Sequence, residues 1–311
     1  MSPTPAQIGR YRIARTVGTG AMGAVYEAFD PVIERKVAIK TVLKDRLDEA
    51  AIGEAVARFK REAQAGGRLS HPGIVAVHEY GEDDDEAYIV MEYVEGKELR
   101  HHFRSGSRFD LIDVLELMKQ LLGALDYSHR KGVVHLDIKP ANLMVLPGPV
   151  LKVMDFGIAR IGPSGNDPEL AADGTPTHMA PERIVGQAAD ARADVWSCGV
   201  VLYELVTGQN PFHADTASAV IYKVLQVSPD PPSALHPSLP AAIDAVVARA
   251  LAKSPQERFQ SAREFQGSLL RAFQDKAVMA PRGLTEAELA LDEETGKVDA
   301  PPAGGKPPQP E

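Results

Sequence analysis

The hydrophobic pattern of the chain changes about a third of the way along. The first part holds short apolar runs bounded by Gly, Pro or Asp, which predict β-strands; they read YRIARTVGTG, GAVYEAFD, RKVAIKTV, GIVAVHEYG and AYIVMEYV. One segment with a helical pattern, over about residues 50–69, interrupts them. After EGKEL the apolar residues recur every three or four positions, as on one face of a helix. A sheet-rich part is therefore expected to precede a helix-rich part.

The stretch 109–131 has the clearest helical pattern. Gly132 follows it and is expected to end the helix, since glycine readily adopts the left-handed conformation of a C-terminal cap. Two further helices are expected over 192–207, ended by Gly208, and over 239–253. The apolar stripe of the first helix consists of Leu111, Val114, Leu115, Met118, Leu121, Leu122 and Leu125.

These patterns divide the chain into two lobes and two tails. The hinge is placed after the last predicted strand, and the Pro-, Gly- and Glu-rich end, which finishes DAPPAGGKPPQPE, is expected to be disordered. In chain order we expect an N-terminal tail (1–10), an N-lobe (11–91), a hinge (92–97), a C-lobe (98–275) and a disordered C-terminal tail (276–311).

Composition restricts the classes of function. The chain has 311 residues and a net charge of -9, so nucleic-acid and anionic-membrane partners are not expected. The only cysteine, Cys198, cannot form an internal disulfide, which fits a reducing, cytoplasmic location. The N-terminus lacks the apolar core of a signal peptide. No apolar run approaches the roughly 18–20 residues that cross a bilayer, so we expect no membrane span within this sequence.

The first candidate motif is a glycine-rich stretch, VGTGAMGAVYEA, at residues 17–28. Gly18, Gly20 and Gly23 give G-x-G-x-x-G, and Val25 follows two positions later. Glycine lets the backbone approach phosphate oxygens and point its amides at them. A dinucleotide-binding loop of this pattern runs from a strand into a helix, whereas both flanks here are strand-like and predict a hairpin. A glycine-rich hairpin without a ligand is the alternative.

The second motif is VAIK, residues 37–40. Side chains alternate between the faces of a strand, so Ala38 and Lys40 share one face. A small Ala leaves room for a flat ring, and Lys40 can reach phosphates from the same side. In the following helical segment Glu54 and Glu62 lie about 12 Å apart along the axis, so both cannot hold Lys40, and we expect Glu62. An exposed strand lysine and a solvated helix glutamate are the alternatives.

The third motif is VVHLDIKPANLMV, residues 133–145, which combines His135 with three chemically useful side chains. Asp137 can accept a hydroxyl proton and orient a nucleophile. Lys139 can steady a phosphoryl group, and Asn142 can hold a metal ion. Phosphoryl transfer needs chiefly such positioning and charge neutralisation. A polar turn between two strands is the alternative.

The fourth motif is VMDFGIAR, residues 153–160, in which Asp155 follows an apolar strand. Mg²⁺ prefers one or two carboxylates together with phosphate oxygens and water, so Asp155 is a candidate metal ligand. Farther along, GTPTHMAPE supplies Thr175 and the sequence Ala180-Pro181-Glu182.

Together these motifs resemble the signature set of the protein kinases. They occur in the order of that family over roughly residues 10–275, and they look most like the bacterial serine/threonine protein kinases of Hanks type. The resemblance implies an α+β fold, the bilobal protein kinase fold, with an antiparallel β-sheet N-lobe that contains one main helix and a mainly helical C-lobe. It also implies ATP and Mg²⁺ as cofactors, with Mn²⁺ as an alternative metal, and protein substrates with Ser or Thr acceptors.

The resemblance assigns roles to individual positions. The implied catalytic residues are Asp137, Lys139, Lys40, Glu62 and Thr175. The implied nucleotide-binding residues are Val17, Gly18, Gly20, Gly23, Val25, Ala38, Lys40, Met91, Glu92, Val94, Glu98 and Leu143. The implied metal ligands are Asn142 and Asp155.

Within these sets Met91 resembles the gatekeeper beside the adenine, and Glu92 and Val94 resemble the hinge that hydrogen-bonds it. Glu98 resembles a ribose contact. Val25, Ala38 and Leu143 would enclose the adenine.

The same resemblance implies three features outside the nucleotide site. Asp194 looks like the buried anchor of the catalytic loop, and Glu182 would pair with Arg258. Lys139 and Thr175 match kinases that act on serine and threonine rather than on tyrosine.

Leu136 departs from the family pattern. Most members carry Arg there, which in many of them receives a phosphate that orders the activation segment and switches the enzyme on. The segment 155–182 holds Ser164, Thr175 and Thr177 as its only hydroxyl acceptors. We therefore expect an activity that does not depend on phosphorylation of this segment, with control from the Glu62 helix, the tail or a partner. Neutral drift and a weaker enzyme are the alternatives.

Two rival functions remain. A pseudokinase scaffold keeps the fold and usually lacks the strand Lys, the catalytic Asp or the metal-binding Asp, all of which are present here. A small-molecule phosphotransferase shares the His-x-Asp loop but lacks the Ala-Pro-Glu element. A homodimer or a regulatory partner is left open.

Overall fold

The computed structural model describes residues 4–20, 23–44, 49–156 and 176–274. All of these residues belong to one compact unit, 1–278. The sequence-predicted C-terminal tail and much of the segment 155–182 lie outside the described residues. No helix within the described part is long and apolar enough to cross a membrane.

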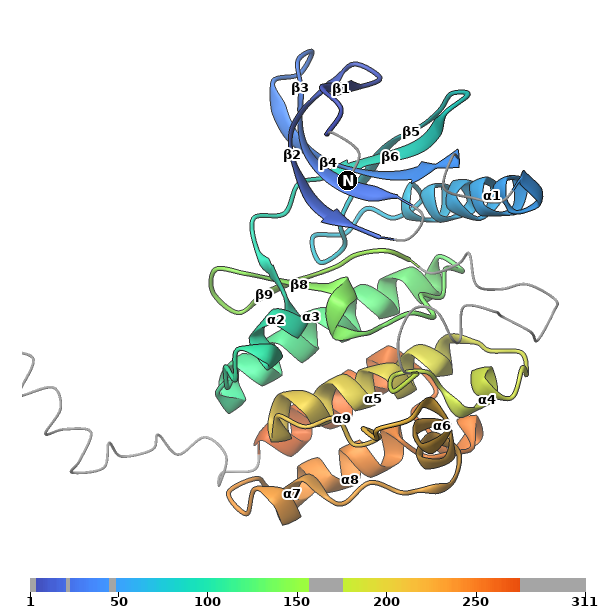
Figure 1. The fold of residues 1–311 in the computed structure, drawn as a ribbon. Coiled ribbons are helices and arrows are strands. Elements are labelled where there is room, and N and C mark those ends of the chain that lie inside the picture. The colour runs from blue at the N-terminus through green and yellow to red at the C-terminus, as the bar shows by residue number, and fades with distance from the viewer. Residues whose placement is uncertain (1–3, 21–22, 45–48, 157–175, 275–311) are drawn as a thin grey trace, which may run out of the picture. The chain divides into compact units, whose positions relative to one another are not determined.

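The N-lobe is built on one six-stranded antiparallel sheet, drawn in blue to teal in Figure 1. Valine, isoleucine, tyrosine and phenylalanine supply its strands, as residues that suit a pleated surface do. The strand order is β1 (Gln7–Ile8), β2 (Tyr11–Thr19), β3 (Ala24–Asp30), β4 (Arg35–Leu43), β6 (Glu86–Glu92) and β5 (Val77–Glu82).

Helix α1 (Glu49–Gly66) packs against this sheet through an apolar stripe. Phe59 and Ala63 are buried with Val42 and Ile89 of the sheet. The helix ends three residues before the predicted boundary, where the amide of Gly67 donates to the carbonyl of Ala63 at 2.9 Å.

The C-lobe is mainly helical, with a three-stranded sheet next to the N-lobe (Figure 1). That sheet joins β7 (Lys97–Glu98), β8 (Leu143–Leu146) and β9 (Val150–Val153). The helices are α2 (Leu99–Arg104), α3 (Leu111–Arg130), α4 (Pro181–Ile184), α5 (Ala191–Thr207), α6 (Ala217–Gln226), α7 (Pro232–Leu235), α8 (Ala241–Ala250) and α9 (Ala262–Gln274).

The strongly periodic helices were predicted closely. Helix α3 ends at Arg130 and is capped by Lys131, directly before Gly132, and α5 is capped by Gly208; the φ angles of the two glycines, 74° and 72°, are left-handed. Helix α8 is shorter than the predicted 239–253 because it starts after Pro240 and is capped at Leu251. The stretch 1–10, expected as a tail, contributes strand β1, since Ile8 is buried against the sheet.

Backbone hydrogen bonds connect the two lobes. The amide of Val75, in the loop before β5, donates to the carbonyl of Val153 at the end of β9 over 2.9 Å. Ile74 forms a parallel bridge with the same residue. The segment that follows β9 is thereby held directly under the N-lobe sheet.

The end of α1 approaches the sheet so closely that Gly66 has no room for a side chain. A Cβ added there would lie 2.6 Å from Cγ2 of Val77. We expect Gly66→Ala to lower the free energy of unfolding by about 1–3 kcal/mol, as overpacking does. Gly53→Ala, in the same helix but with nothing within 4 Å of an added Cβ, should raise it by up to about 1 kcal/mol. Urea unfolding of both variants measures the difference, and equal effects would contradict the packing argument.

Candidate active site

A lysine and two carboxylates meet where the lobes face each other. Lys40 comes from β4, Glu62 from α1 and Asp155 from the residues after β9. Lys40 Nζ lies 2.7 Å from Glu62 Oε1 and 3.2 Å from Asp155 Oδ1. Glu62 is thus the partner of Lys40, as predicted, whereas Glu54 pairs with Arg58 at 3.2 Å.

The charge of Lys40 is stabilised by this arrangement. Burial alone would lower the pKa of its ammonium group, but the carboxylates of Asp155 and Glu62 raise that pKa above its usual value. An opposite charge within about 4–6 Å favours the charged form in this way. The site therefore presents a fixed cation beside two acids.

A second cluster lies in the loop between α3 and β8. Asn142 donates from Nδ2 to the backbone carbonyl of Asp137 at 2.8 Å and to its Oδ2 at 3.0 Å. Lys139 Nζ lies 3.0 Å from the same carboxylate oxygen. The loop thus brings together the three polar side chains that the third motif singled out.

The backbone of this loop is held by a buried carboxylate of α5. Asp194 accepts hydrogen bonds from the amides of His135 at 2.8 Å and Leu136 at 2.7 Å, and from Nε2 of His129 at 2.8 Å. Its side chain is fully buried. Leu136 has a φ of 63°, a left-handed conformation that non-glycine residues rarely adopt. Asp194 thus occupies the anchoring position that the resemblance implied.

The ring of His135 connects this loop to Asp155. Its Nε2 donates to the carbonyl of Met154 at 2.8 Å, and its Nδ1 accepts from the amide of Asp137 at 3.1 Å. The ring also packs against Phe156, with centroids 4.6 Å apart. One imidazole therefore contacts the backbone of Met154, next to Asp155, and the backbone of Asp137.

The donor set of Asn142 and Asp155 fits a nucleotide-bound Mg²⁺. Mg²⁺ keeps water and phosphate oxygens as ligands and needs only one or two protein groups. The amide nitrogen of Asn142 is engaged by Asp137, which leaves its amide oxygen for a metal ion. Within the described residues, no group of three or more His, Cys, Asp or Glu forms a metal cage.

The glycine-rich stretch connects β2 to β3, as the hairpin prediction required. An added Cβ would meet nothing within 4 Å at Gly18 and only a backbone oxygen at 3.9 Å at Gly20, so open space lies beside both. Gly23 differs, because a Cβ there would lie 1.8 Å from the carbonyl of Thr41. Val17 is exposed on β2 just before the hairpin. Gly23 is therefore needed for strand packing, whatever its role toward phosphates.

The side chains expected around adenine come from both lobes. Ala38 lies opposite Met91 in the sheet. Val25, opposite Lys40, is half-buried, as are Ala38 and Met91. Leu143 begins β8 in the C-lobe and is buried.

The hinge residues have partners of their own. The carboxylate of Glu92 is 2.5 Å from Nζ of Lys152 in β9. Val94 is half-buried in the hinge. Glu98, expected to contact a ribose, pairs with Arg100. A ribose hydroxyl would share that carboxylate with Arg100.

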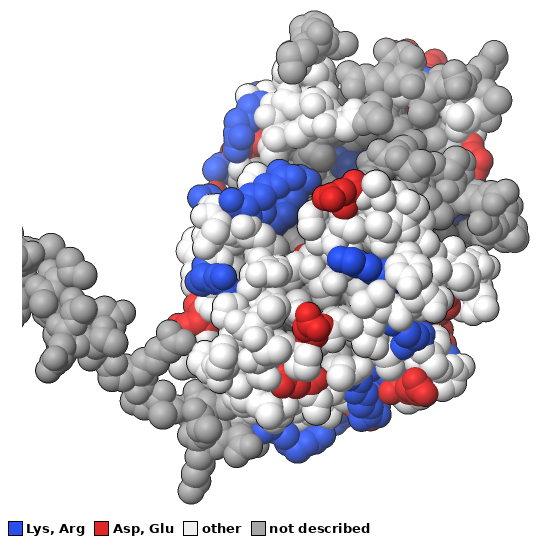
Figure 2. All heavy atoms as spheres, turned by 60° about the horizontal axis from the view of Figure 1, so that its bottom comes forward, with Lys and Arg blue, Asp and Glu red and all other residues white. Residues whose placement is uncertain are grey.

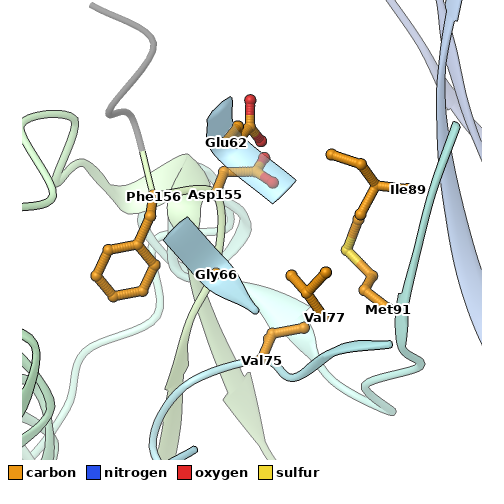
Figure 3. A pocket seen from close by; sticks show the side chains of 8 residues that line it. All are labelled: Glu62, Gly66, Val75, Val77, Ile89, Met91, Asp155 and Phe156. Atoms are coloured by element: carbon orange, nitrogen blue, oxygen red, sulfur yellow. The ribbon is translucent and has the colours of Figure 1, made fainter. Parts of the chain in front are cut away.

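A pocket opens beside the Lys40–Glu62 pair, between α1 and the sheet (Figure 3). Glu62 and Asp155 line one side of it, and apolar side chains of the sheet line the other. Its lining residues are Glu62, Gly66, Val75, Val77, Ile89, Met91, Asp155 and Phe156.

The segment that precedes α5 is fixed by one buried pair and one partly buried pair. Glu182 binds both terminal nitrogens of Arg258, at 2.7 and 2.9 Å, as the resemblance implied. His178 Nε2 lies 2.8 Å from Glu204, and its Nδ1 lies 3.1 Å from the hydroxyl of Thr177. Thr175 lies outside the described residues.

Sequence reasoning missed several contacts of this site. His129 and Lys152 were not singled out, and Arg183, whose Nη1 donates to the carbonyl of Leu136, was not considered. Arg183 follows Glu182 directly, but nothing in the sequence relates it to a loop that lies 47 residues earlier.

Figure 2 shows the face that lies at the bottom of Figure 1. Lys and Arg side chains gather at the upper left of this view, and on the rest of the face they lie singly among Asp, Glu and uncharged residues.

Comparison with known proteins gives consistent matches. The protein kinase domain family matches residues 11–268. Serine/threonine-protein kinase PknB of Mycobacterium tuberculosis is 42% identical over 293 residues, which cover 92% of this chain and 46% of that protein. Serine/threonine-protein kinase PksC of Streptomyces coelicolor is 41% identical over 313 residues, 97% of this chain and 56% of that protein. The probable serine/threonine-protein kinase SCO3848 of the same organism is 45% identical over 263 residues, 82% of this chain and 39% of that protein. The chain thus spans about half the length of the curated relatives it matches.

Asp194 should be indispensable for the stability of the loop. In Asp194→Asn one buried amide donor loses its charged acceptor, and we expect the free energy of unfolding to fall by about 1.5–3 kcal/mol. Asp190→Asn is the control, because Asp190 caps the same helix at its exposed N-terminus and Asn caps about as well, so it should cost less than about 1 kcal/mol. Chemical denaturation measures both. A loss for Asp194→Asn no larger than that of the control would refute the anchoring role.

Proposed function

We propose that this chain, which belongs to the protein kinase family, transfers the γ-phosphoryl group of ATP to serine and threonine hydroxyls of proteins. The observation that carries the proposal is the meeting of Lys40 and Asp155, from the two lobes, next to the loop that holds Asp137. Phosphoryl transfer needs a fixed cation, a carboxylate that binds a metal ion and a carboxylate that orients the acceptor hydroxyl.

The residues divide the work between binding and chemistry. Lys40, held by Glu62, would bind phosphate oxygens of ATP beneath the glycine-rich hairpin. Asp137 would accept the proton of the acceptor hydroxyl as its oxygen attacks the γ-phosphorus and the bond to the leaving ADP oxygen breaks. Lys139 would offset the charge on the transferring group.

Mg²⁺, held by Asn142 and Asp155 together with phosphate oxygens, would neutralise negative charge on the nucleotide. Mn²⁺ prefers similar oxygen ligands and could replace it. The apolar walls at Val25, Ala38 and Leu143 would hold the adenine without help from the metal ion.

The two alternative functions, a pseudokinase and a small-molecule phosphotransferase, differ from a protein kinase in whether phosphate is transferred and to which acceptor. A pseudokinase would bind ATP without turnover, and a small-molecule phosphotransferase would act on alcohols. The Glu182–Arg258 pair fixes the segment that a protein substrate would meet, which favours protein acceptors. Transfer to casein or myelin basic protein, compared with transfer to small alcohols, separates these cases.

We also propose that turnover does not require phosphorylation of the activation segment. Leu136 stands where relatives use an Arg to receive the phosphate, and its side chain is buried in the apolar core of the C-lobe. A leucine needs no counter-ion, so the unphosphorylated state leaves no unpaired buried charge at this position. A cytoplasmic location, where ATP is abundant and thiols such as Cys198 stay reduced, completes the proposal.

Lys40→Met should abolish transfer while leaving the fold intact. The strand accepts an apolar side chain, but the phosphates and Glu62 lose their cation, so we expect turnover to fall at least about 10²-fold. Lys36→Met is the matched control, because Lys36 lies four residues earlier in the same strand and is exposed, and it should retain nearly full activity. Radiolabelled phosphate transfer to casein measures both. Near-normal turnover in Lys40→Met would overturn the nucleotide site.

Removing phosphate from the segment should change turnover by less than about tenfold, or about 1.4 kcal/mol of barrier. Ser164 and Thr175 lie outside the described residues, and the hydroxyl of Thr177 is already 3.1 Å from His178. The protein is treated with phosphatase, mass spectrometry verifies that all three hydroxyls are bare, and turnover is measured. A larger loss would show that Leu136 does not make the enzyme independent of this modification.

A further inference from the structure

We propose that Arg183 is a positioning residue for Asp137. Its guanidinium would fix the peptide unit that joins Leu136 to Asp137, and thereby the direction in which the Asp137 carboxylate leaves the backbone. This inference rests on the proposed function only for its effect on turnover; its effect on the peptide unit can be measured without any activity.

The peptide unit between Leu136 and Asp137 is bound at both ends. Arg183 Nη1 donates to its carbonyl oxygen, which belongs to Leu136. Its N–H, which belongs to Asp137, donates to Nδ1 of His135 at 3.1 Å. Because a peptide unit is planar, the two bonds together determine its orientation.

This peptide unit needs such a restraint. Leu136 has a φ of 63°, and a left-handed conformation is unfavourable for a residue with a Cβ. Asp194 fixes the amide of Leu136 from one side at 2.7 Å. The carbonyl on the other side of the same residue is fixed by Arg183. Rotation of the plane about ψ of Leu136 would move the Asp137 carboxylate away from Asn142 and Lys139.

The backbone that carries Arg183 is held by the neighbouring residue. Arg183 belongs to α4 and directly follows Glu182, which forms a buried pair with Arg258. Figure 1 shows α4 to the right of α5, the helix that carries Asp194. Both ends of the Leu136 backbone are therefore tied to the body of the C-lobe, one by a carboxylate and one by a guanidinium.

The position of the Arg183 guanidinium explains how the loop can be restrained although residue 136 is an uncharged leucine. The side chain of Leu136 is part of the apolar core and supplies no charge. Arg183 brings a permanent positive charge to the carbonyl of the same residue, and a guanidinium cannot be deprotonated in proteins. The restraint is thus present without any modification of the chain.

The test compares Arg183→Met, Arg183→Lys and the surface control Arg130→Met. Arg130 is exposed and pairs with Asp126 within its own helix. We expect Arg183→Met to lower kcat at least about tenfold, with KM for ATP within about twofold of the wild type. Arg183→Lys keeps one charged donor and should recover most of kcat. Arg130→Met should match the wild type.

Hydrogen exchange supplies the readout that needs no activity. In Arg183→Met the amide of Asp137 should exchange at least about tenfold faster than in the wild type, while amides in the middle of α3 should not change. Unchanged exchange at Asp137 would overturn the inference, whatever the kinetics.

The kinetic outcomes are equally decisive. An unchanged kcat in Arg183→Met overturns the positioning role. The role is also overturned if kcat falls in both Arg183→Met and Arg183→Lys and the melting temperature falls with it. If the wild-type protein transfers phosphate to no protein acceptor, the proposed function is refuted instead. The exchange rate of the Asp137 amide in Arg183→Met then still tests the positioning role.

Discussion

The carboxylate of Asp194 is the constraint on which the site depends. A buried charge is tolerated only when hydrogen bonds replace its water, and here the donors are the amides of His135 and Leu136 and the ring of His129. Two adjacent amides can point at one carboxylate only if the backbone turns sharply between them. That turn is made by φ and ψ of His135, which lies between the two amides, and the left-handed φ of Leu136 then sets the direction in which the chain continues to Asp137.

A second constraint ties the two lobes to each other. Lys40 bridges Glu62 and Asp155, so a helix and a sheet of the N-lobe are coupled to a residue that follows the C-lobe strand β9. His135 extends the connection, since its ring binds the carbonyl of Met154. Lys40 and the loop that carries Asp137 are thus linked through Asp155, Met154 and His135. A displacement of α1 would therefore change the contacts of Asp155 more directly than those of Asp137.

Local patterns in the sequence predicted the features that depend on neighbouring residues. Distant contacts such as Glu182–Arg258 were expected only from the family resemblance. Each motif is contiguous, so its spacing places the side chains, whereas the distance along one helix showed only that Glu54 and Glu62 could not both hold Lys40. The strand before Asp155, which is β9, was expected, but its pairing with β8 and the two-residue β7 was not, because such short strands amid helices give little periodic signal. The close approach of Gly23 to the carbonyl of Thr41 on β4 was not foreseen, and it adds a packing requirement to the phosphate role that stays a prediction. Arg183 was missed because no local rule relates it to the loop it contacts.

The leucine at 136 then has a physical meaning. A buried Arg at that position would carry a charge that is stable only when an anion arrives, and the arrival of a phosphate is what makes such a loop switchable. Leu136 lies in the apolar core and carries no such charge, which is the physical basis of the independence from phosphorylation that we propose. The guanidinium of Arg183 donates to the carbonyl of the same residue, a contact that does not depend on the side chain at position 136. If turnover is independent of the segment, as we propose, regulation would act on a different element, and the contact of Glu62 in α1 with Lys40 makes that helix the strongest candidate.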